Sequence, residues 1–117
     1  MTIEEEMSRL PKLKHVGIAL VQFVYSLQNG TFAKKTEWIY SSNFVAFGIP
    51  KRVEKIHLIL KEYPKEIVDP NLLPLFAGRW NFVRGEITSP RQLECAARYI
   101  AACHRIWYQD IVGKPPK

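Results

Sequence analysis

The sequence has only two cysteines and no long apolar run, and each shortage excludes a class of protein. Cys95 and Cys103 lie in a segment that we expect to be helical, where their spacing corresponds to a rise of about 12 Å, too long for a disulfide. We therefore expect two reduced, structural thiols. The longest apolar stretch, Val16 to Leu27, is interrupted by Gln22 and is too short to span a bilayer. Residues 1–15 mix acids and bases, so we expect no signal peptide, no membrane partner and a cytoplasmic protein.

Complete catalytic and metal-binding motifs are also missing. The sequence has no CxxC pair, no histidine spacing that completes a zinc site and no evident Ser-His-Asp ordering. His15 follows Lys14, His57 is two residues from Lys55, and His104 falls on the apolar face of a predicted helix, so we interpret all three as structural. We expect no catalytic residue, no metal and no cofactor, and we favour a protein that is not an enzyme.

Acidic residues are scarce outside the first segment. The chain carries 17 Lys and Arg against 11 Asp and Glu, and three of the acids are Glu4, Glu5 and Glu6. The rest of the chain has an excess of positive charge that attracts polyanions. Nucleic acid is the favoured polyanion, and an anionic membrane surface is the second choice. The alternative is a basic surface that binds neither.

The composition predicts one packed domain. The chain has 117 residues, of which 47% are hydrophobic, and this suits a single core. Thr2 and Glu5 fit a capping box at the start of a short helix within an acidic segment, residues 1–11. Apolar residues at helical spacing predict a buried central helix over residues 12–28, which Asn29-Gly30 terminates.

The second half of the chain suggests further helices. We expect helices over residues 50–63 and 70–78, and a final one that begins with Ser89-Pro90 and Gln92, ends at Gly113 and is followed by a tail, residues 114–117. Residues 31–49 are interpreted as a short helix or loop, and residues 79–85 as a brief strand or an aromatic loop. The predicted fold is all-α, a single helical domain over residues 1–117 with about five helices around the central one.

The last predicted helix carries a row of arginines on its outer side. Arg91, Arg98 and Arg105 are seven residues apart, so they stack two turns from one another in a row that suits a phosphate backbone. Glu94 can pair with Arg98 and with Arg91, so a solvated, salt-bridged face is the alternative.

A second basic group lies at the start of the predicted helix 50–63. Lys51, Arg52 and Lys55 would surround a positive helix end, and Lys34 and Lys35 could add to them, although Glu54 interrupts the group. Most aromatic residues should be core. Those in predicted loops could stack on unpaired bases, chiefly Trp38, Tyr40 and Trp80.

Three segments resemble the small ribonuclease III-like proteins. The central helix reads VGIALVQFVYSL from Val16 to Leu27, which is similar to the signature helix of that family. Ser42-Asn43 matches its next segment, and Leu93 to Ala102 looks like its second acidic helix. The resemblance implies an all-helical fold and a nuclease ancestry.

The residues that would hold the family's Mg²⁺ depart from its pattern. Ile18 and Arg91 stand where the family has acids, and Glu94 alone remains. One carboxylate cannot build a metal cage that activates water. The resemblance therefore implies a protein that has lost hydrolysis and keeps RNA binding or dimerisation.

From these features we expect a non-catalytic nucleic-acid-binding protein. RNA is favoured over DNA, and the protein would act in a larger ribonucleoprotein or as a small oligomer such as a homodimer. One alternative is a small helical subunit of an RNA-guided (CRISPR-type) surveillance complex. Another is a protein-protein interaction module that docks a partner on apolar positions such as Leu58 and Ile106.

Overall fold

The protein combines helices with an antiparallel sheet. The computed structural model describes residues 2–62, 64, 68–78 and 82–112. Its elements are, in chain order, α1 (Ile3–Ser8), α2 (Lys14–Ser26), β1 (Ala33–Lys34), β2 (Ile39–Ser41), β3 (Val45–Gly48), β4 (Ile56–Leu60), β5 (Phe76–Ala77), β6 (Val83–Ile87), a 3-10 turn (Pro90–Gln92), α3 (Leu93–Trp107) and a π-helical turn (Tyr108–Val112). None of the helices in these ranges is long and apolar enough to cross a membrane.

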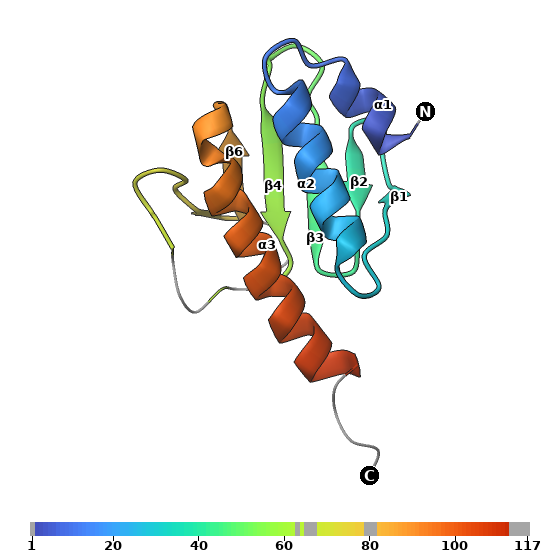
Figure 1. Ribbon diagram of the computed structural model, residues 1–117, viewed down its shortest axis with the longest axis vertical. Coiled ribbons are helices and arrows are strands. Elements are labelled where there is room, and N and C mark those ends of the chain that lie inside the picture. The colour runs from blue at the N-terminus through green and yellow to red at the C-terminus, as the bar shows by residue number, and fades with distance from the viewer. Residues whose placement is uncertain (1, 63, 65–67, 79–81, 113–117) are drawn as a thin grey trace.

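The six strands form one sheet in the order β1-β2-β3-β4-β6-β5, and every neighbouring pair is antiparallel. The two edge strands, β1 and β5, have 2 residues each, which limits the backbone left open to pairing with another chain. Helices α2 and α3 lie across the same face of the sheet (Figure 1). The opposite face carries no helix among the described residues.

Strand β4 separates the apolar core from the open face of the sheet. Ile56, Leu58 and Leu60 are each 0% exposed and belong to the core beneath the helices. Their neighbours along the strand, His57, Ile59 and Lys61, line a pocket on the other side. Successive side chains of a strand point to opposite faces, so this short segment supplies the core and a surface site at once.

Local signals in the sequence mark the start of α1 and of the turn that leads into α3. Thr2 and Glu5 form a capping box at α1, and Ser89 and Gln92 form one at the turn that leads into α3. After α2 the chain reverses at Asn29, which has a φ of 64°. The C-cap of α2 is Leu27, which is extended with a φ of −84° and a ψ of 148°, so the left-handed residue predicted from Asn29-Gly30 is present but lies two positions beyond the C-cap.

Gly17 lets the N-terminal helix pack closely on the central one. Ile3 and Met7 of α1 are buried, and a Cβ on Gly17 would lie 2.5 Å from the Met7 Sδ. The acidic segment is therefore part of the fold, docked through two apolar residues. Its glutamates stay at the surface of α1 or only half-buried.

The all-α prediction and the helical-bundle architecture are wrong. Residues 31–49 form β1, β2 and β3, the expected helix 50–63 contains β4 after an irregular stretch, and the expected helix 70–78 contains a turn and β5. For residues 79–85, which the sequence left open between a brief strand and an aromatic loop, the structure shows Val83, Arg84 and Gly85 inside β6, while residues 79–81 lie outside the described residues. The run from Ile56 to Leu60 fits a helical stripe as well as a strand, and a short apolar run does not separate the two. Residues 56–60 form a strand because their backbone pairs with β3 on one side and with β6 on the other.

The sheet also corrects two expectations attached to function. The all-helical fold that the ribonuclease III-like resemblance implied is not the fold of this chain, and the helical bundle behind the surveillance-subunit alternative is likewise absent. Leu58, named above as an exposed docking position, is fully buried. The predicted tail 114–117, Gly113 and Trp80 lie outside the described residues.

The burial of Leu58 makes a test of the strand assignment. Leu58→Ala should lower the free energy of unfolding by about 2–5 kcal/mol, because the truncation leaves a cavity under α3. Val53→Ala, at a position that is 56% exposed, is the control and should change it by about 0.5 kcal/mol or less. Urea unfolding followed by circular dichroism measures both. Equal stability of the Leu58 variant and the wild type would contradict the register of β4.

Candidate anion-binding site

The open face of the sheet is hollowed into a pocket with a volume of about 540 Å³, which we call the sheet-face pocket. Its apolar lining comes from Ile39, Ala46 and Ile59 on the three neighbouring strands β2, β3 and β4. Its other lining residues include three cations, one histidine and two aromatic side chains: Lys35, Lys61, Arg84, His57, Trp38 and Phe82. No carboxylate is among the described residues that line it.

Lys61 follows β4 directly and is half-buried. Its Nζ donates hydrogen bonds to the Ser41 Oγ and to the carbonyl oxygen of Ser42, both neutral acceptors. Burial lowers the pKa of Lys61, and the nearby charge of Lys35 lowers it further. The Lys61 ammonium is half-buried, has another cation nearby and has no carboxylate partner among the described residues. These conditions favour the binding of an anion.

Trp38 lies over the other end of the pocket, at the close of the loop between β1 and β2. Its ring meets the ring of His57 edge-on, with 5.8 Å between the centroids. A Cβ on Gly48 would come within 2.8 Å of the Trp38 Cζ3, so the glycine in β3 is what lets the indole approach this strand closely. The Trp38 side chain is still 38% exposed, which leaves part of the ring open to a ligand.

His57 is held in its neutral form by this environment. It is only 9% exposed, and its Nε2 is buried without a hydrogen-bond partner among the described residues. Burial lowers the pKa of His57, and the charges of Arg84 and Lys55 lower it further, while Glu86 acts in the opposite direction. Lys55 and Glu86 pair at 3.2 Å beside the pocket, and the hydrogen bond from Lys55 lowers the pKa of Glu86.

Of the eight residues predicted to bind nucleic acid, only Lys35 lines the sheet-face pocket. Lys55 borders it through its pair with Glu86. Lys34 is on edge strand β1 with its Nζ over the Tyr40 ring. Lys51 and Arg52 lie in the irregular connection from β3 to β4, where Lys51 pairs with Glu37, so the helix end expected there is absent.

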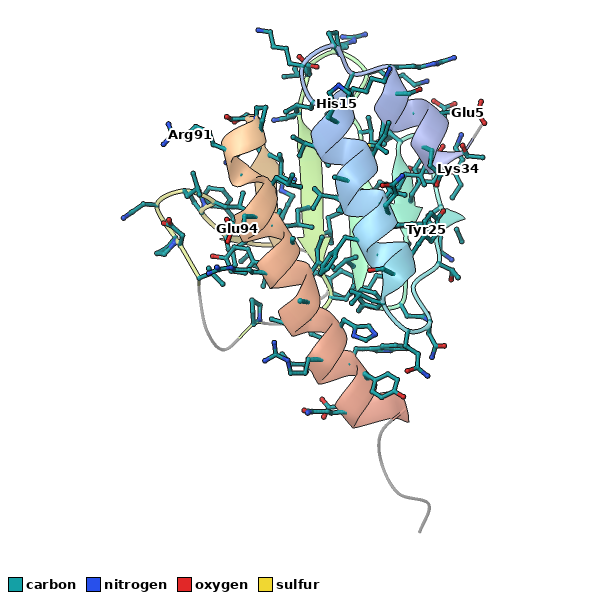
Figure 2. The ribbon with its side chains drawn as sticks, viewed as in Figure 1. Glu5, His15, Tyr25, Lys34, Arg91 and Glu94 are labelled. Atoms are coloured by element: carbon teal, nitrogen blue, oxygen red, sulfur yellow. The ribbon has the colours of Figure 1, made fainter. Side chains whose placement is uncertain are left out.

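The arginine row stands on the helical side of the molecule. Arg91 is in the turn before α3, and Arg98 and Arg105 are on α3. All three are exposed, and none of them lines the sheet-face pocket. Arg98 is paired with Glu94 at 2.8 Å, as the solvated-face alternative anticipated. Arg91 and Lys34 lie on opposite sides of the view, and Lys34 is near Glu5 (Figure 2). The structure does not bring the eight predicted residues into one surface. It does place Lys34, Lys51 and Arg52 around a second pocket, as the prediction of a joint basic group anticipated, but Glu6, Glu37 and Glu54 line the same pocket.

The sequence analysis did not identify Lys61 and Arg84 as site residues, and it did not place His57 in a pocket. All three face the open side of the sheet and alternate with core residues. His57 and Lys61 alternate with Leu58 and Leu60, and Arg84 follows Val83. A period of two through these segments was the signal, and the helical interpretation of residues 50–63 concealed it. Trp38, one of the aromatic residues kept as candidates, does line the pocket, whereas Tyr40 is only 3% exposed.

The cysteines have no part in this pocket. Both are free and buried, and Cys103 donates a hydrogen bond from its thiol to the Glu62 carbonyl oxygen at 3.1 Å. Burial raises the pKa of Cys103 to about 12, so the thiol is protonated at neutral pH. The prediction of unlinked, structural thiols is confirmed.

The lowered pKa of His57 predicts a pH-dependent stability. Unfolded histidine titrates at about 6.5. Below that pH the unfolded chain binds a proton that the folded protein does not yet accept, so the free energy of unfolding falls until the pH reaches the folded-state pKa. His57→Gln should remove this fall, whereas His15→Gln, at an exposed position on α2, should keep it. Urea unfolding between about pH 7.5 and pH 5.5 tests this; an unchanged pH slope in the His57 variant would contradict it.

Comparison with known proteins gives no relative for this chain: no family model, no curated protein and no solved structure matches it.

Proposed function

We propose that the protein binds single-stranded nucleic acid, RNA in the first instance, in the sheet-face pocket and without catalysis. The observation that carries the proposal is the lining of this pocket, which joins three cations to two aromatic rings and, among the described residues, includes no carboxylate. Phosphate groups require the first feature, and unpaired bases use the second as stacking surfaces. Few other classes of ligand bind through cations and aromatic rings together on one open face of a sheet.

Single strands suit the site better than a duplex. The aromatic rings of Trp38 and Phe82 belong to a hollow rather than to a protruding element, and a base reaches such a ring only when it is unpaired and turned outward. The two strands of a duplex would keep their bases stacked inside. The contacts left to a duplex would be phosphates at Lys35 and Arg84, the two exposed cations.

A second copy of the chain is a poorer occupant of the same face. Two copies packed face to face would bring two sets of Lys35, Lys61 and Arg84 together, and Glu86 on this face already pairs with Lys55. Like charges brought together in a desolvated interface cost several kcal/mol. Charge complementarity therefore favours a polyanion over a dimer on this face.

Charge reversal on the two faces of the molecule tests the proposal. We expect wild type to bind an oligouridylate with a dissociation constant of the order of micromolar at about 0.1 M salt. For the three phosphates that three cations would contact, the slope of log affinity against log salt should be about −2. Lys35→Glu with Arg84→Glu should weaken binding by at least about tenfold and flatten the slope.

The matched control reverses two exposed arginines on the helical side. Arg91→Glu with Arg105→Glu changes the net charge by the same amount and leaves the pocket intact, so binding should change little. Fluorescence anisotropy with labelled RNA, and with DNA of the same sequence, measures the affinities. Equal losses in the two double variants would mean that net charge alone is responsible, and a larger loss in the control would move the site to α3.

A further inference from the structure

The two aromatic residues of the sheet-face pocket stand at opposite ends of β4. Trp38 contacts His57 near the start of this strand, as the 5.8 Å separation of the two rings shows. Phe82 comes directly before Val83, which pairs with Leu60, so Phe82 lies beside the end of β4, next to Lys61. Both aromatic side chains line the same pocket.

The distance between these ends sets the size of a ligand that uses both rings. His57 and Lys61 are four residues apart along the strand, a separation of about 13 Å. Successive bases stacked in one strand are only about 3.4 Å apart. A stacked dinucleotide is therefore too short to cover both rings, and a strand that does so has to be unstacked and extended.

Cations occupy the interval between the rings. Arg84 pairs across the sheet with Ile59, the middle residue of the open face of β4. Lys61 closes the end near Phe82, and its ammonium group has one N–H left after its bonds to Ser41 and Ser42. A sugar-phosphate backbone that follows β4 would pass these cations while its bases face the floor and the rings.

We propose that the pocket binds about three nucleotides of an extended single strand that runs along β4, with a base on Trp38 at one end, a base on Phe82 at the other, and the intervening phosphates at Arg84 and Lys61. His57 serves as a positioning residue, because its buried ring holds the indole of Trp38 in place. This footprint rests on the proposed function and adds its length and direction.

A length series of oligouridylates, from the mononucleotide to the hexanucleotide, tests the footprint. Affinity should rise steeply up to the trinucleotide and then level off, since longer strands add no contact with the second ring. Trp38→Leu and Phe82→Leu should each weaken trinucleotide binding by about tenfold, the usual loss of one stacked base. The double variant should bind the trinucleotide no better than the mononucleotide.

Phe76 provides the matched control. It is 54% exposed on β5 and pairs with Arg84, so it shares the open face, but it is not a lining residue of the pocket. Phe76→Leu should leave every affinity unchanged. Trp38→Phe keeps a ring at the first position and should lose less than Trp38→Leu, and thermal unfolding verifies that each variant is folded.

The possible outcomes separate the footprint from the function. Affinity that levels off at the mononucleotide, or a Phe82 variant that behaves like the Phe76 variant, overturns the footprint while salt-dependent binding of long strands still supports the function. Failure of the wild type to bind even long oligonucleotides at low salt overturns both.

Discussion

The positions of the core and of the sheet-face pocket both depend on the alternation of side chains along β4. A strand in the middle of a sheet has to satisfy two environments at once, and here Ile56, Leu58 and Leu60 fill the core beneath α2 and α3 while His57, Ile59 and Lys61 face the open side. A shift of one residue in the pairing would exchange the two sets and bury a lysine and a histidine under the helices. The core therefore fixes the register, and the register places the pocket.

The positive charge of the open face follows from the same geometry. The two helices cover one side of the sheet, so the polar members of each strand collect on the other, where Lys61 and Arg84 join Lys35 from the loop after β1. Hydrogen bonds from Lys61 to Ser41 and Ser42 offset part of the cost of its burial and leave its charge unbalanced. A bound phosphate would supply the missing negative charge, which supports the proposed binding of a polyanion in this pocket.

The arginines on the helical side show why an exposed charge is weaker evidence for an anion-binding site than a half-buried one. Glu94 and Arg98 pair on the outer surface of α3, with 79% and 60% of their side chains exposed, and such a pair contributes little to stability or binding. Regular spacing along the sequence makes these arginines conspicuous, but all three are exposed to solvent. Of the three cations of the pocket, Lys61 is half-buried, so part of its hydration is already replaced by protein.

Local signals in the sequence determined the start of α1, the start of the turn before α3, the turn after α2, the free thiols and the excess of positive charge. Capping boxes at Thr2 and Ser89 and the turn at Asn29 depend on residues a few positions apart, so a short window contains all the physics involved. The fold class depends instead on contacts between segments that are distant in the sequence. Residues 31–49 and 56–60 become strands because each pairs with segments distant in sequence, and no short window contains those partners. The pocket has the same origin, since Lys35, His57 and Arg84 come from three separated segments that only the register of the sheet brings together.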